Sequence, residues 1–114
     1  MHYFCKLSPR GKWSYTAMRV RCALHPEYPD MIEQFVRMGA FLAQRGHVGD
    51  WEAAEHTVRV LLDSATDAAL PPPWRERCLS HVGSQLELLD EMALTGEQRG
   101  LARWHRQRAE LAFD

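Results

Sequence analysis

One segment, residues 51–82, restricts the fold of this chain more than any other: WEAAEHTVRVLLDSATDAALPPPWRERCLSHV. Apolar side chains recur in it with the 3.6-residue period of an amphipathic α-helix, at Trp51, Ala54, Val58, Leu61, Leu62 and Ala65. Three consecutive prolines at 71–73 then stop the pattern, because proline is tolerated only in the first turn of a helix. The segment predicts a helix over residues 51–69, with Asp50 as its N-cap, and a further helix from residue 73 or 74.

The rest of the chain shows the same period between short links. We expect a first helix over residues 12–24 and a second from residue 30 to about 45, where Asp30 and Glu33 have the spacing of a capping box. The helix that begins at residue 73 or 74 should continue to about 93. A fifth helix opens at Thr95, with Gln98 completing a second capping box. No segment alternates between apolar and polar residues as a strand would.

These elements predict an all-α fold, an antiparallel four-helix bundle with a fifth, C-terminal helix that either packs on the bundle or binds a partner. Residues 1–11 should form an irregular N-terminal arm, and residues 1–114 a single helical domain, since this length suits one core. The apolar face expected for the fifth helix carries Leu101, Trp104, Arg108 and Leu111.

Composition narrows the choice of partner and compartment. The formal charge is −1, from 14 basic and 15 acidic residues, so no excess of basic charge indicates nucleic-acid binding. No run approaches the roughly 20 apolar residues of a membrane span, and we recognise no signal peptide. Three cysteines, an odd number, argue against a disulfide framework. We therefore expect a cytoplasmic protein without nucleic-acid or membrane partners.

Carboxylates along the third expected helix form the main candidate site. Glu55, Arg59, Asp63 and Asp67 follow one another at four-residue spacing, Glu52 and His56 lie beside them, and Glu33 lies on the preceding helix. Ferric iron is a hard ion that prefers oxygen donors with some imidazole, and an arginine beside the metal could hold a synergistic anion. The Glu-x-x-His spacing of ferritin-like di-iron bundles is absent. The alternative is an ordinary helix-stabilising ladder of opposite charges.

Two Cys-x-x-His pairs, Cys22 with His25 and Cys78 with His81, offer a zinc site as another alternative. Both cysteines also fall where a small buried residue suits a bundle, which is the simpler interpretation. No acid, base and nucleophile converge in the sequence, so we expect no enzyme activity. Trp104, on the thin apolar face of the fifth helix, instead suggests a protein interface.

An ordered set of residues resembles the Fur-associated gene A (FagA) family of small bacterial iron-starvation proteins. The set runs through Ala23-Leu24-x-Pro26-x-x-Pro29, Ile32-Glu33, Gly39, Leu42, Trp51-x-x-Ala54-Glu55-x-x-x-Arg59-x-Leu61-Leu62-Asp63-x-Ala65-x-Asp67 and Leu70-Pro71-x-x-Trp74-Arg75-x-x-Cys78-Leu79. The resemblance covers residues 21–90. It implies an all-helical fold, production under iron starvation and a role in iron handling. His25 and Ala68 depart from the family's pattern, which has acidic residues there.

The leading hypothesis is a cytoplasmic protein that binds iron(III) through Glu33, Glu55, Asp63 and Asp67, with His56 added on chemical grounds and Arg59 as charge partner or anion holder. The first alternative is a metal-free interaction module whose C-terminal helix forms a homodimer or binds another protein. The second alternative is the cysteine–histidine zinc site.

Overall fold

The computed structural model describes residues 6–113, and these residues form six helices without a strand. The helices are α2 (Pro9–Cys22), α3 (Asp30–Gln44), α4 (Asp50–Ala65), α5 (Pro72–Ser80), α6 (Val82–Met92) and α7 (Gly96–Phe113). The prediction of an all-α helical bundle is confirmed. No helix within residues 6–113 is both long and apolar enough to cross a bilayer.

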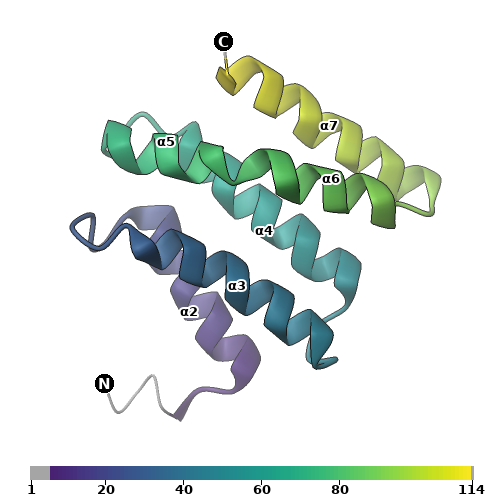
Figure 1. Ribbon diagram of the computed structural model, residues 1–114, viewed down its shortest axis with the longest axis horizontal. Helices are drawn as coiled ribbons and strands as arrows, with labels where there is room; N and C mark the ends of the chain where they lie inside the picture. The colour runs from purple at the N-terminus through teal and green to yellow at the C-terminus, as the bar shows by residue number, and fades with distance from the viewer. Residues whose placement is uncertain (1–5, 114) are drawn as a thin grey trace.

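Helix α4 is the centre of the bundle, because it contacts each of the other five helices. In Figure 1, α6 crosses in front of α4, α3 lies beside α4 on the side away from α6, and α7 lies at the edge beyond α6. The apolar stripe of α4 is accordingly buried, with Val58, Leu61 and Leu62 fully enclosed. The polar residues of α4 are left beside α2 on one flank and beside α7 on the other.

Three helix boundaries differ from those expected. Helix α2 begins at Pro9, within the expected arm, because Ser8 caps it by accepting a hydrogen bond from the Gly11 amide at 3.0 Å. Helix α4 ends at Ala65 instead of residue 69. The helix expected from residue 73 or 74 to 93 is two helices, α5 and α6, separated at His81. Residues 1–5 of the expected arm lie outside the described part of the chain.

The capping predictions have mixed outcomes. The Thr95–Gln98 box is confirmed, since the Gln98 amide donates to Thr95 Oγ1 at 3.0 Å and the Thr95 amide to Gln98 Oε1 at 3.2 Å. Asp30 and Asp50 were expected as N-caps and instead lie in the first turns of α3 and α4. Acidic residues still favour that position, because they face the positive end of the helix dipole.

Helix α7 packs through a different face from the one expected. The structure buries Ala102, His105 and Ala109, while Trp104 and Leu111 are 51% and 76% exposed. The two alanines allow close approach to α4 and α6, which larger side chains would prevent. Of the two roles that the sequence left open for this helix, packing on the bundle is therefore observed, but the Trp104 and Leu111 side chains remain on the surface.

Candidate functional site

A polar pocket of about 160 Å³ lies between α2 and the exposed side of α4. Three of the six residues singled out from the sequence line it: Glu55, His56 and Arg59. The other lining residues are Arg10, Trp13, Ser14 and Glu52. Spacings of three and four residues put the α4 members on one face of the helix. The pocket thus combines two guanidinium groups, two carboxylates, an imidazole and a hydroxyl.

Two basic side chains hold Glu55, one at each carboxylate oxygen. His105 Nε2, on α7, lies 2.9 Å from Glu55 Oε2, and Arg59 Nη2 lies 3.4 Å from Oε1. The hydrogen bond from His105, followed by the charge of Arg59, holds the pKa of Glu55 below its ordinary value although burial opposes the shift. Glu55 is therefore a carboxylate at neutral pH, with its side chain only 15% exposed.

His56 is a neutral hydrogen-bonding group. Its ring packs edge-on against Trp13, with centroids 4.8 Å apart, and lies near Phe35. This burial, together with the charge of Arg59, lowers the pKa of His56. Arg59 Nη2 lies 3.1 Å from His56 Nδ1, and since arginine only donates, Nδ1 accepts and the hydrogen is on Nε2. In this tautomer His56 offers an N–H to a ligand and has no free lone pair for a metal.

Arg10 closes the other end of the pocket. Its Nη2 donates to Glu52 Oε2 at 2.6 Å, and its Nη1 donates to the carbonyl oxygen of His47 at 3.3 Å. The Arg10 hydrogen bond lowers the pKa of Glu52. Both side chains are about half exposed, as is that of Arg59. Exposed ion pairs are weakly stabilising and exchange partners readily, so these charges are accessible to a charged ligand.

Glu33, the residue expected on the neighbouring helix, lies outside the pocket. Arg77 Nε is 3.0 Å from both Glu33 carboxylate oxygens, and His81 Nε2 is 2.5 Å from Oε2. Arg77 also reaches Asp30 at 2.7 Å. These hydrogen bonds, that of Arg77 above all, lower the pKa of Glu33. Its carboxylate ties α3 to the α5–α6 junction.

Asp63 and Asp67 are likewise paired with arginines from other helices. Arg108 on α7 donates to Asp63 Oδ1 at 2.8 Å, and Arg21 on α2 donates to Asp67 Oδ2 at 2.7 Å. The Arg21 bond lowers the pKa of Asp67. Of the six residues singled out, the structure thus brings together Glu55, His56 and Arg59 and disperses Glu33, Asp63 and Asp67.

Metal donors are sparse throughout the part of the chain that the structure describes, where no three His, Cys, Asp or Glu side chains group closely enough to hold an ion. Cys22 is exposed, whereas Cys78 is fully buried and burial raises its thiol pKa to about 12, which disfavours the thiolate that binds zinc. The expectation that both cysteines are buried was wrong for Cys22.

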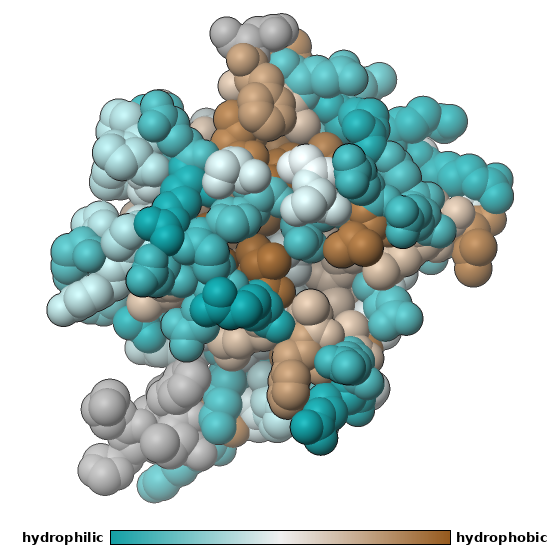
Figure 2. Space-filling view, in the orientation of Figure 1, coloured by the Kyte–Doolittle hydropathy of each residue, from teal (hydrophilic) through white to brown (hydrophobic). Residues whose placement is uncertain are grey.

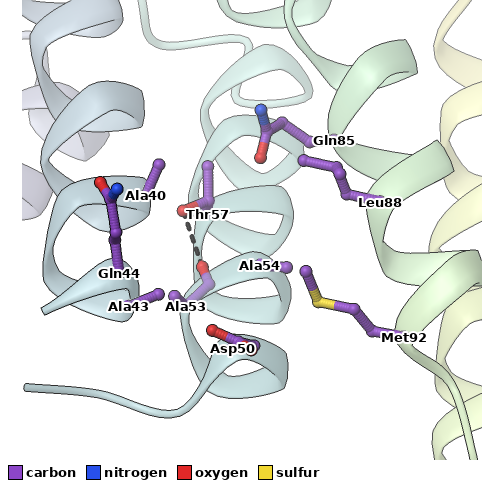
Figure 3. Close-up of a pocket in the computed structure, with 10 residues that line it drawn as sticks. All are labelled: Ala40, Ala43, Gln44, Asp50, Ala53, Ala54, Thr57, Gln85, Leu88 and Met92. Carbon is purple, nitrogen blue, oxygen red and sulfur yellow. Dashed lines mark hydrogen bonds between the residues drawn. The ribbon is translucent and has the colours of Figure 1, made fainter. Parts of the chain in front are cut away.

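A second pocket, of about 240 Å³, lies between α3, α4 and α6 and is mainly apolar. In Figure 3, Ala54 of α4 faces Met92 of α6, while Ala53 lies on the other side of α4, next to Ala43 of α3. Figure 2 shows apolar surface in this middle region, bordered by hydrophilic side chains. Of the ionisable residues, only Asp50 lines this pocket, so it lacks the charged groups that distinguish the polar pocket.

Sequence reasoning missed four residues at or beside the polar pocket. Arg10 was overlooked because the helix was expected to begin only at residue 12, and Ser14 because the outward face of that helix carries no motif. Trp13 also packs in the core, where its Nε1–H donates to the Phe35 carbonyl at 3.3 Å. His105 was missed because it lies outside the apolar face that the sequence suggested for this helix. The available signal was its spacing of three and four residues from Ala102 and Ala109.

Comparisons with protein-family models, curated proteins and solved structures find no match for this chain. The resemblance to the FagA family therefore rests on the sequence pattern alone.

Proposed function

We propose that this chain is an iron-starvation protein that binds ferric iron as an anionic carboxylate complex, in the polar pocket between α2 and α4. The observation that carries the proposal is the pairing of opposite groups in one pocket: Arg10, Arg59 and His56 donate to anions, while Glu52 and Glu55 supply hard oxygen atoms. The FagA resemblance supports the link to iron.

The chemistry of the pocket favours a complex over a bare ion. A bare ferric ion would meet two guanidinium charges and an imidazole whose Nδ1 already accepts from Arg59. A ferric carboxylate complex brings its own oxygen ligands, which compensates for the scarcity of converging protein donors. Its free carboxylates would be held by Arg10 and Arg59, and arginine binds carboxylates with paired N–H groups.

The proposal is tested by titrating the protein at pH 7 with ferric citrate, gallium citrate, citrate alone and zinc chloride in separate experiments. Ferric citrate and gallium citrate should both bind, because the gallium(III) ion has the same charge as the ferric ion and a similar radius. Arg59→Gln and Glu52→Gln should each weaken binding roughly tenfold or more, the usual effect of losing a charged hydrogen bond. Arg21→Gln is the matched control, since Arg21 pairs with Asp67 away from the pocket.

Equal affinity for ferric citrate in wild type, Arg59→Gln and Glu52→Gln would contradict the proposal. Tight binding of zinc without binding of ferric citrate would also contradict it, and would favour the cysteine–histidine site. Loss of binding in the Arg21→Gln control to the same degree would show that the pocket variants act through overall stability.

A second candidate function is association of two copies through α7, supported by the exposure of Trp104 and Leu111 on this helix. Leu101, Trp104, Arg108 and Leu111 have the three-four-three spacing of a packed helix pair. Two antiparallel copies of α7 centred on residue 106 would place Leu101 against the other copy's Leu111, and Trp104 against its Arg108. Within one chain Arg108 already lies 5.0 Å from the Trp104 ring, the geometry of a cation–π contact.

Sedimentation equilibrium over a range of protein concentrations tests this candidate. Wild type should form a dimer that Trp104→Ala shifts toward monomer, because aromatic residues at helix interfaces contribute a large share of binding energy. Phe41→Ala is the control, since Phe41 is 52% exposed on a different helix. A wild-type protein that stays monomeric at the highest concentration contradicts association through α7.

A further inference from the structure

His105 is the most unusual buried polar residue among those described. It is fully buried, yet its Nδ1 has no hydrogen-bond partner within residues 6–113. Its other ring nitrogen, Nε2, contacts Glu55, which lies 50 residues away in the sequence and lines the polar pocket. Burying an imidazole with one unpaired nitrogen costs stability, so plain packing is a poor explanation for a histidine at this position.

We propose that His105 is a positioning residue for the polar pocket, which fixes the carboxylate of Glu55 toward the ligand and makes α7 a part of the site. This inference rests on the proposed function, because it assigns a role at the same pocket.

The geometry supports a positioning role. Since a carboxylate only accepts hydrogen bonds, His105 Nε2 donates to Glu55 Oε2. With Oε2 held from the buried side, Oε1 is the oxygen beside Arg59. The carboxylate is thereby oriented and kept charged, as hydrogen bonds from neighbouring residues commonly do for the ligands of metal sites.

Helix α7 is built to hold His105 in place. Ala102 and Ala109, one turn to either side of it, are buried and bring the helix backbone close to the bundle. The Trp104 ring lies 5.0 Å from the His105 ring, between centroids. The imidazole therefore has little freedom to turn away from Glu55.

The test compares His105→Leu, which removes the donor, with His105→Gln, whose amide can still donate. Arg108→Gln is the control, because it removes another tie between α7 and α4 without touching the pocket. Two quantities are measured: the pKa of Glu55, from the ¹³C resonance of its carboxyl group, and the affinity for gallium citrate, which is diamagnetic. Circular dichroism establishes that each variant is folded.

We expect His105→Leu to raise the pKa of Glu55 and to weaken binding by roughly 10- to 100-fold, the range found for residues that support metal ligands. His105→Gln should retain most of the affinity, and Arg108→Gln should change neither quantity. A folded His105→Leu protein with the wild-type pKa of Glu55 and wild-type affinity would overturn the inference. Equal losses in His105→Leu and Arg108→Gln would also overturn it, because they would indicate a merely structural role.

The two proposals fail in different ways. If wild type does not bind gallium citrate, the proposed function fails, while the titration of Glu55 in His105→Leu still tests the positioning role. If His105→Leu does not fold, the comparison uses His105→Gln and the His105 ring resonances of wild type. Those resonances should shift when gallium citrate fills the pocket, whereas an unchanged His105 resonance at saturation would overturn the inference.

Discussion

Glu33 illustrates how a side chain with the properties of a metal ligand can serve the fold. Its carboxylate accepts from Arg77 and His81, both at the α5–α6 junction, and is only 21% exposed. Two basic side chains that lie more than 40 residues away in the sequence therefore meet at one carboxylate. The sequence identified Glu33 as a potential metal ligand from its residue type and its place on a helix. Arg77, the partner that determines its role, lies more than 40 residues away in the sequence.

We predict that Glu33→Gln lowers stability in a pH-dependent way. The folded-state pKa of Glu33 lies below its ordinary value of 4.5, so its contribution to stability is present above pH 4.5 and is lost as the pH falls through the folded-state value. At pH 7 the variant should melt roughly 2–6 °C below wild type. The difference should shrink as the pH is lowered past 4.5, measured by circular dichroism.

A melting difference for Glu33→Gln that stays constant from pH 7 to pH 3 would contradict a role through the charged carboxylate. The same variant should bind ferric citrate as wild type does, since Glu33 does not line the polar pocket.

Of the charge ladder expected on α4, one ion pair forms and the next does not. Glu55 and Arg59 are an i,i+4 pair, as the spacing predicted. Asp63 lies one turn from Arg59 and was expected to pair with it, but it pairs with Arg108 of α7. Periodicity identifies neighbours on one helix, whereas the choice between a local and a distant partner depends on how the helices pack.

At the scale of the elements, Gly39 marks a point where α3 packs tightly against α2 and α4. A Cβ atom at this position would lie 2.9 Å from the Trp13 ring and 3.0 Å from Thr57 Oγ1. Glycine is needed there because of close packing, and its neighbour Trp13 also borders the polar pocket. The packing of α3 is thereby linked to the shape of the pocket.

We predict opposite effects of alanine at two helical glycines. Gly39→Ala should destabilise the protein by about 1–3 kcal/mol, because it overpacks the contact with Trp13 and Thr57. Gly83→Ala, in α6, meets nothing within 4 Å and should stabilise by at most about 1 kcal/mol through higher helix propensity. Urea denaturation measures both changes. A neutral Gly39→Ala would contradict the close approach of α3.

The sequence predicts which segments are helical more reliably than it predicts where each helix begins and ends. An apolar stripe runs unbroken across the α5–α6 junction, which is why periodicity hides the break at His81; its buried members are Trp74, Cys78, Val82, Leu86 and Leu89. Helix α4 ends early for a local reason: the hydroxyl of Thr66 bonds to the Leu62 carbonyl at 2.7 Å, and Asp67 accepts from the Ala69 amide.

At the scale of the whole molecule, the candidate site is assembled from three helices. Arg10 and Trp13 come from α2, the polar ladder comes from α4, and His105 reaches it from α7. The sequence identified the α4 members, since they lie on one helix. The contributions of α2 and α7 follow from how these helices flank α4, which no local pattern encodes.

The central claim is that iron enters the polar pocket together with a carboxylate ligand. The most direct measurement equilibrates the untagged protein with ferric citrate containing ¹⁴C-citrate in the presence of zinc, removes free ligand by desalting, and determines iron, zinc and citrate per chain. We predict near-stoichiometric iron and citrate retained together, with little zinc, and loss of both in Arg59→Gln. Iron retained without citrate, zinc in place of iron, or no metal at all would contradict the account.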